Sequence, residues 1–226
     1  MATNISLNLD ENGKQVDEKI YRGMIGSLVY LTTSRPDIMF ATCLCTHFQN
    51  SPKESHMSAL KRIFKYLKET SDFGLYCPIT HILDLLAYSD ANNVGNRTDR
   101  KSTSGTCHFL GNALISWFSK KQNCVALSIT EAEYISAALA CSQVLWMKQM
   151  LSNLGLDFKQ TKIWCDNTSA INLSKNPVNH SRTKHIDVRH NFLRDNVLKG
   201  EIKLDFVNTK DQLADIFTKV LSKKGL

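Results

Sequence analysis

The chain has 226 residues, of which 42% are hydrophobic, so it can bury a sizeable core and is not a disordered chain. Its 28 Lys and Arg against 21 Asp and Glu give a net charge of +7, which favours a polyanionic partner such as nucleic acid. Seven cysteines without a CxxC pair, together with the lack of a long apolar run or a signal-like leader, argue against disulfides, zinc knuckles, membrane spans and secretion. We therefore expect an intracellular protein, in the cytoplasm or the nucleus.

Residues 1–80 are expected to form a helical segment. Tyr21–Thr33 is apolar, and Ile38–Phe48 has the pattern of a buried helix. Ser51, Pro52 and Glu54 match a capping box, which predicts that a third helix begins there. That helix is basic outside its apolar face, which indicates either an ordinary solvated surface or a surface that follows a phosphate backbone. The basic residues are Lys53, Lys61, Arg62, Lys65 and Lys68.

Short strands are expected from about residue 81 onward. Ile82–Asp90 is an apolar run typical of a buried strand, and its last residue is an acid that could hold a cation or simply begin a turn. Thr103–Leu110 and Ala113–Ser119 are joined by a Gly-Asn turn and predict a hairpin. Asn123–Leu127 is a candidate for one more short strand.

The longest helical pattern runs from Thr130 to Leu154 and opens with Glu131 and Glu133. Either acid could belong to a cap, because Ser128 can pair with Glu131 and Thr130 with Glu133. The apolar residues expected to face inward are Ile135, Leu139, Leu145, Trp146, Met150 and Leu154.

The strand-then-acid arrangement occurs a second time at Thr161–Asp166, followed by a helix from Asn167 to about Ser174. Glu201–Val207 alternates as a strand does, and Asp211–Val220 is expected to be a terminal helix with Asp211 and Asp215 on one face. Acids that follow two neighbouring strands, with a helical Glu between them in sequence, would be costly to keep ionised without a cation.

Phosphodiester hydrolysis suits such a cluster. Two Mg²⁺ ions about 3.5 to 4 Å apart can activate a water on one side of the phosphorus and stabilise the leaving oxygen on the other. Carboxylates are the ligands that hard cations prefer. This interpretation requires the acids to meet at one edge of the sheet, with no lysine or arginine occupying the place of the ions.

Several motifs then make the sequence similar to a known family. They resemble, in order, the ribonuclease H domain at the C-terminal end of the Pol polyprotein of copia-type LTR retrotransposons, and YRGMIGSLVYL with SRPDI resembles the segment that joins the reverse transcriptase to it. The motifs are YSDAN (Tyr88–Asn92), RKSTSG (Arg100–Gly105), SITEAEY (Ser128–Tyr134), CDNTSAI (Cys165–Ile171), SRTKHIDVRHNFLRD (Ser181–Asp195) and QLADIFTK (Gln212–Lys219).

The resemblance implies an α/β fold of the ribonuclease H type, a mixed five-stranded sheet flanked by helices at residues 81–226, behind the helical segment at 1–80. It implies metal-dependent cleavage of the RNA strand of RNA:DNA hybrids, with two Mg²⁺ ions, or Mn²⁺ in their place. Matched motif by motif, the catalytic and metal-binding acids are Asp90, Glu133, Asp166 and Asp215. Glu131 is then expected to cap its helix, and Asp211 to stand at the start of the terminal helix. Candidate contacts to nucleic acid are Lys101, Thr130, Asn167 and Lys184.

The sequence departs from the family in two ways. The loop Val207–Lys210 lacks the His that many ribonuclease H enzymes carry before the last acid, and the chain has no paired-Asp polymerase signature, so it should not synthesise DNA. The expected partner is an RNA:DNA hybrid, with the polymerase part of a reverse transcriptase or a host protein as further candidates. The alternatives are a weakly active or inactive module that binds nucleic acid or protein, and an integrase, whose order of acids and zinc module are not seen here.

Overall fold

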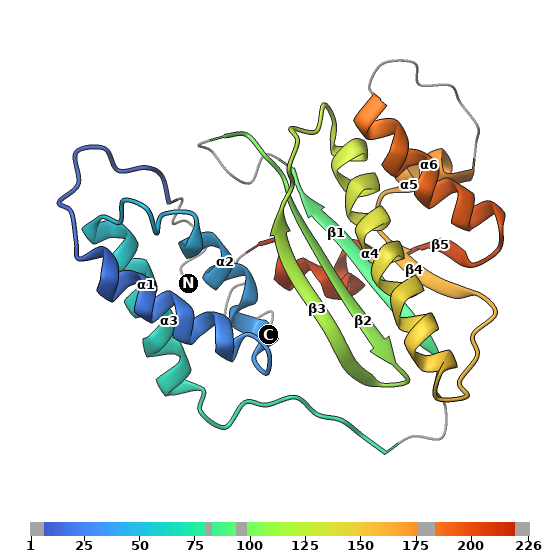
Figure 1. Ribbon diagram of the computed structural model, residues 1–226, viewed down its shortest axis with the longest axis horizontal. Helices are drawn as coiled ribbons and strands as arrows, with labels where there is room; N and C mark the ends of the chain where they lie inside the picture. Colours follow the sequence, from blue (N-terminus) through green and yellow to red (C-terminus); the bar gives the residue numbers. More distant parts are fainter. Residues whose placement is uncertain (1–6, 80–82, 94–98, 176–183, 220–226) are drawn as a thin grey trace.

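A mixed five-stranded sheet in the order β3-β2-β1-β4-β5 forms the centre of the computed structural model (Figure 1). The structure describes residues 7–79, 83–93, 99–175 and 184–219, with the backbone alone at 184–190. The expected fold, a mixed sheet flanked by helices behind a helical N-terminal segment, is confirmed. The strands are β1 (Leu85–Asn92), β2 (Thr103–Leu110), β3 (Ala113–Lys121), β4 (Thr161–Cys165) and β5 (Ile202–Phe206).

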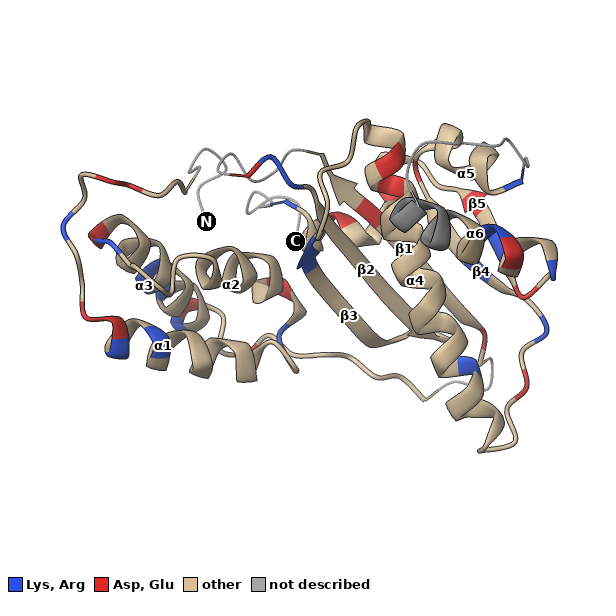
Figure 2. Ribbon diagram, turned by 45° about the horizontal axis from the view of Figure 1, so that its top comes forward, with Lys and Arg blue, Asp and Glu red and all other residues tan. Residues whose placement is uncertain are grey.

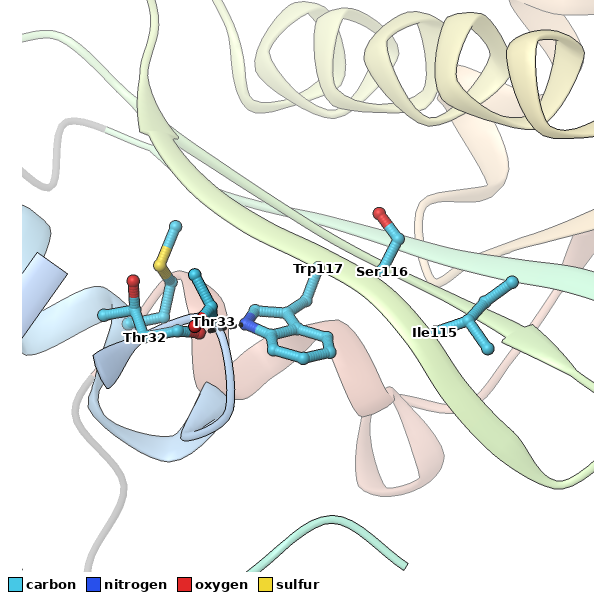
Figure 3. Close-up of a pocket in the computed structure, with 6 residues that line it drawn as sticks. Thr32, Thr33, Ile115, Ser116 and Trp117 are labelled. Atoms are coloured by element: carbon cyan, nitrogen blue, oxygen red, sulfur yellow. Dashed lines mark hydrogen bonds between the residues drawn. The ribbon is translucent and has the colours of Figure 1, made fainter. Parts of the chain in front are cut away.

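Helices cover both faces of the sheet. The long helix α4 packs on β1 and β2, with α5 and α6 beside it, whereas the short 3-10 helix η3 packs on the opposite face (Figures 1 and 3). In chain order the helices of this part are α4 (Ile129–Ser152), α5 (Thr168–Lys175), α6 (Lys184–Leu198), η2 (Thr209–Asp211) and η3 (Leu213–Phe217).

The buried face of α4 was predicted in part: Ile135 is buried as expected, and Leu145 packs against the core. Small residues such as Ala137, Ala140 and Cys141 lie fully buried against the sheet, which lets the helix approach it closely. Trp146 and Leu154, which were expected to face inward, are 56% and 75% exposed, and Met150 is also exposed. The prediction was wrong there because the large apolar residues mark a different stripe of the helix from the small residues that pack.

The N-terminal segment has a hydrophobic cluster of its own, built around Tyr21, Leu28 and Leu60. The Asp17 carboxylate caps its first helix by accepting from the backbone N–H groups of Lys19 and Ile20. Its helices are α1 (Glu18–Leu31), η1 (Pro36–Ile38), α2 (Met39–Thr46) and α3 (Glu54–Glu69).

The predicted capping box of the third helix is wrong in its residues. The N-cap of α3 is Lys53, and His56 Nδ1 accepts from the Lys53 backbone N–H at 3.0 Å. Glu54 is therefore the first residue of the helix, and Ser51 lies outside it. A histidine in the third helical position has taken the part expected of a glutamate.

Side chains of β3 connect this segment to the sheet. Trp117 Nε1 donates to the Thr32 carbonyl at the end of α1 (2.9 Å), and the Cys43 thiol donates to the Ser119 carbonyl. The Trp117 ring lies beside a shallow pocket lined also by Thr33 and Ile115 (Figure 3). The N-terminal helices thus contact β3, and α2 and η1 also contact η3.

Several element boundaries also differ from expectation. β1 starts at Leu85 and continues through Asn92, so Asp90 lies inside the strand; the expected start at Ile82 lies outside the described residues. Residues 123–127 form no strand. The expected terminal helix is two short 3-10 helices, η2 and η3, separated at Gln212. Within the described ranges, no helix is both long and apolar enough to cross a membrane.

Candidate active site

Parallel pairing of β1 with β4 brings two acids to the same edge of the sheet. Tyr88 is paired with Trp164, so two residues further along the strands Asp90 and Asp166 are neighbours. Asp90 is 6% exposed, and Asp166 follows β4 in a partly exposed position. Figure 2 shows acidic positions gathered where β1 ends and α4 begins.

Glu133 enters from the second turn of α4. It is 4% exposed, and its Oε1 accepts from the Ala91 backbone N–H at 3.1 Å, which ties the helix to β1. Its Oε2 is buried and makes no hydrogen bond within the described part of the chain. Glu131, by contrast, accepts from the Leu127 backbone N–H at 2.7 Å and belongs to the start of the helix.

Asp215 enters from η3, on the other face of the sheet. Lys219 Nζ lies 2.6 Å from Asp215 Oδ2, while Asp215 Oδ1 is buried without a partner among the described residues. A basic side chain therefore contacts one oxygen of this acid. Lys219 is itself partly exposed at the rim of the cluster.

The pKa values of two of these acids, Asp90 and Glu133, are raised. Burial raises the pKa of Glu133 to about 9, and the charges of Asp90 and Asp166 add to the effect. Burial likewise raises the pKa of Asp90 to about 6, with the nearby charges of Asp215 and Asp166 acting in the same direction and the Thr218 hydrogen bond opposing them. Without a cation, the cluster keeps protons near neutral pH.

Hydroxyl groups that the sequence did not point to orient two of these acids. The Thr218 hydroxyl donates to Asp90 Oδ2, and the Thr209 hydroxyl donates to Asp166 Oδ2 at 2.9 Å. Ser136 on α4 donates to the Asp90 carbonyl at 2.7 Å. Thr218 lies within the motif QLADIFTK and Ser136 just after SITEAEY, but hydroxyls are too common in sequences to have been selected without the fold.

A tighter group forms among three of the side chains. One ligand atom each from Glu133, Cys165 and Asp166 lie within 4.8 Å of one another. Asp90 and Asp215 stand just outside this group and interact with it electrostatically. The unpartnered oxygens of Glu133 and Asp215, with the other carboxylates, are a donor set that suits hard divalent cations.

The candidate contacts to nucleic acid surround this edge unevenly. Thr130 lies on the first turn of α4, and Lys101 precedes β2. Asn167 Oδ1 accepts from the Ala170 N–H at 2.9 Å, so its side chain is used in part to cap α5. Lys184 begins α6, and its side chain lies outside the described residues.

The chain is similar to polyproteins of plant transposons. It is 43% identical over 224 residues to the retrovirus-related Pol polyprotein from transposon RE1 of Arabidopsis thaliana, covering 99% of this chain and 15% of that protein. It is 40% identical over 208 residues to the retrovirus-related Pol polyprotein from transposon TNT 1-94 of Nicotiana tabacum, covering 90% of this chain and 15% of that protein. The chain thus spans about 15% of the length of these curated relatives.

A solved structure has a similar arrangement over almost the whole chain. The foamy viral protease-reverse transcriptase in complex with an RNA/DNA hybrid aligns with a TM-score of 0.52 at 13% identity, covering 96% of this chain and 27% of that one. At this identity the likeness concerns the fold. No family model matches the chain.

Proposed function

We propose that this chain, which belongs to the retrovirus-related Pol polyproteins of transposons, is a metal-dependent endoribonuclease of the ribonuclease H type. Its substrate would be the RNA strand of an RNA:DNA hybrid. The observation that carries the proposal is the meeting of Asp90, Glu133, Asp166 and Asp215 from four separate parts of the chain. Burial, and then the charge of neighbouring acids, raises the pKa of Asp90 and of Glu133. Such clusters are costly and typical of functional sites.

Divalent metal fits this cluster. One buried oxygen each of Glu133 and Asp215 has no partner among the described residues and is free to bind a cation, and the four acids supply oxygen donors only. Asp90, Glu133, Asp166 and Asp215 would hold two Mg²⁺ ions, with Mn²⁺ as a possible substitute. When bound, the metal activates water and stabilises the charge that develops on phosphate.

The chain's own residues prepare the site. The Ala91 N–H holds one Glu133 oxygen and leaves the other directed into the cluster. The Thr209 and Thr218 hydroxyls fix the orientation of Asp166 and Asp90. Supporting contacts of this kind restrict the rotamers of the ligands before metal and substrate arrive.

The positive net charge supports binding of a polyanion. Lys101, Thr130, Asn167 and Lys184 remain our candidates for contacts to the hybrid. We further propose that residues 1–80 are the connection segment of a reverse transcriptase and residues 81–226 the nuclease domain. Partners would then include the polymerase part of a reverse transcriptase or a host protein, and this chain would not itself polymerise DNA.

Cleavage of a labelled RNA:DNA hybrid tests the proposal. Asp90→Asn and Asp166→Asn should each lower Mg²⁺-dependent cleavage by about a hundredfold or more, because each removes a proposed metal ligand. Asp211→Asn is the matched control, since Asp211 is an exposed acid on η2 and should leave cleavage within about twofold.

The reaction is run with and without Mg²⁺ or Mn²⁺, next to duplex RNA and duplex DNA. Circular dichroism establishes that each variant is folded. Full activity in both the Asp90 and the Asp166 variant would refute the two-metal proposal.

A second candidate function, binding without hydrolysis, is favoured by one observation. Lys219 already neutralises Asp215 and could keep a metal ion away from it. Under this alternative the wild-type chain binds the hybrid but does not cut it, and Lys219→Gln restores measurable cleavage. Cleavage by the wild type, unchanged or reduced in Lys219→Gln, would exclude it.

A further inference from the structure

Cys165 is the residue of this cluster that the proposed function leaves without a role. It is the last residue of β4, is fully buried, and directly precedes Asp166. Its sulfur and one oxygen each of Glu133 and Asp166 lie within 4.8 Å of one another. A thiol thus lies beside two of the acids proposed to hold metal.

Glu133 provides an independent indication that this group can take a ligand. Only 4% of the residue's surface is exposed, yet its Oε2 has no hydrogen-bond partner among the described residues. Its other oxygen is already committed to the Ala91 N–H. The unpartnered oxygen is therefore available to a cation lying between Glu133, Cys165 and Asp166.

The chemistry of the donors separates two classes of metal. Mg²⁺ takes oxygen ligands and gains little from sulfur, whereas Zn²⁺ and Cd²⁺ bind thiolate strongly. Ligand atoms around tetrahedral Zn²⁺ lie roughly 3.3 to 3.8 Å apart, as follows from metal–ligand distances of about 2.0 to 2.3 Å. The present spread of up to 4.8 Å exceeds that by about 1 Å, which small side-chain rotations can close.

We propose that Glu133, Cys165 and Asp166 form a binding site for one thiophilic divalent cation, Zn²⁺ or Cd²⁺. On binding, a metal–sulfur bond replaces the S–H bond of Cys165, and the proton is released to solvent. Because the site shares Glu133 and Asp166 with the proposed Mg²⁺ ligands, its occupation excludes Mg²⁺. Only this inhibitory consequence rests on the proposed nuclease function; the binding itself does not.

The alternative role of Cys165 is structural: its sulfur accepts from the Asn167 backbone N–H at 3.5 Å, and its side chain packs in the core. Its side chain belongs to the hydrophobic cluster beneath α4, where a small apolar group is needed. A thiol with that role alone would not contribute to metal binding. The two roles give different results when Cd²⁺ is added.

Ultraviolet absorption during titration with Cd²⁺ distinguishes them, since Cd²⁺–thiolate bonds have a charge-transfer band. The full chain is used in a Cys77→Ser, Cys124→Ser background, because Cys77 is exposed and Cys124 partly exposed. We expect a band that saturates at one Cd²⁺ per chain. Cys165→Ser should abolish the band and weaken Cd²⁺ binding by at least about tenfold.

Cys43→Ser in the same background is the matched control, since Cys43 is partly buried and distant in sequence from the cluster. It should leave the band unchanged. Glu133→Gln, which keeps the thiol, should weaken Cd²⁺ binding by about tenfold and serves if Cys165→Ser does not fold. A band that survives Cys165→Ser, or no band in the parent protein, overturns the proposal.

The nuclease assay keeps this result separate from the proposed function. Hybrid cleavage without a Cd²⁺–thiolate band would refute the thiophilic site and leave the nuclease intact. A band without hybrid cleavage by any preparation would support the thiophilic site and refute the nuclease.

Discussion

Glu133 is a carboxylic acid placed where water does not reach it. Burial, and then the charges of Asp90 and Asp166, raise its pKa to about 9, far above that of an exposed glutamate. A folded-state pKa above the unfolded value means that the native protein binds more protons than the unfolded chain between the two values. Metal-free stability from this group is complete at acid pH and is lost as the pH rises toward 9.

Glu133→Gln should therefore stabilise the metal-free protein at pH 8 by at least about 1 kcal/mol, because an amide in this place has no charge to desolvate. At pH 4.5 the difference from wild type should nearly vanish. Urea unfolding in the presence of a chelator measures both. Equal destabilisation at both pH values would mean that Glu133 is a neutral hydrogen-bonding group only.

Among the elements, η3 determines whether the site is complete. It carries Asp215 and is followed by Thr218, and it packs on β2 at Gly105. A Cβ added at Gly105 would lie 2.6 Å from Thr218 Cγ2 and 2.8 Å from Phe217 Cβ. A side chain at position 105 would therefore clash with η3 and the residue after it. The glycine allows η3 to pack on β2, and this packing brings Asp215 and Thr218 to the other acids.

Gly105→Ala should push η3 away from the sheet and lower the free energy of unfolding by about 1 to 3 kcal/mol. Hybrid cleavage should fall even under conditions in which the variant is fully folded. Gly23→Ala on α1 is the matched control, because a Cβ there meets nothing within 4 Å. Thermal unfolding and initial cleavage rates are compared for both. Wild-type behaviour of Gly105→Ala would show that η3 need not pack so closely.

α4 shows how far periodicity can be relied on for an element. Its existence and its end were predicted well, and the N-cap is Ser128, which accepts from the Glu131 N–H at 3.1 Å. Its inward face was predicted wrongly at Trp146 and Met150. A helix packed tightly on a sheet buries small residues, and size complementarity to strands far away in sequence is not visible in a hydropathy pattern.

At the scale of the whole molecule, the chain between the N-terminal helices and the sheet is largely exposed at residues 73–79. Residues 73–79 have no regular secondary structure, and Tyr76 and Ile79 are 83% and 99% exposed. The side-chain contacts that join the parts, such as Trp117 to Thr32, lie elsewhere. This supports our proposed division near residue 80.

Brief digestion with chymotrypsin should cut first after Phe73 or Tyr76, giving two fragments that stay associated through the contacts of β3. Mass spectrometry identifies the cut, and gel filtration measures the association. Tyr76→Ser should slow the first cut, whereas initial cleavage inside α3 or the sheet would argue against the division.

Hydropathy period in the sequence predicted most of the helices and strands, because it is a local property of a chain. The family resemblance of short motifs predicted the mixed sheet, and it selected the four acids as candidates. Asp211 could be set aside in favour of Asp215 only through the motif Leu213-Ala214-Asp215, and the 3-10 form of that segment was not foreseen. The tertiary structure decided which groups surround the acids: Thr218 and Lys219 at one side, Cys165 at another. The contact between Thr218 and Asp90 joins residues 128 apart in the sequence, and no local pattern encodes such a contact.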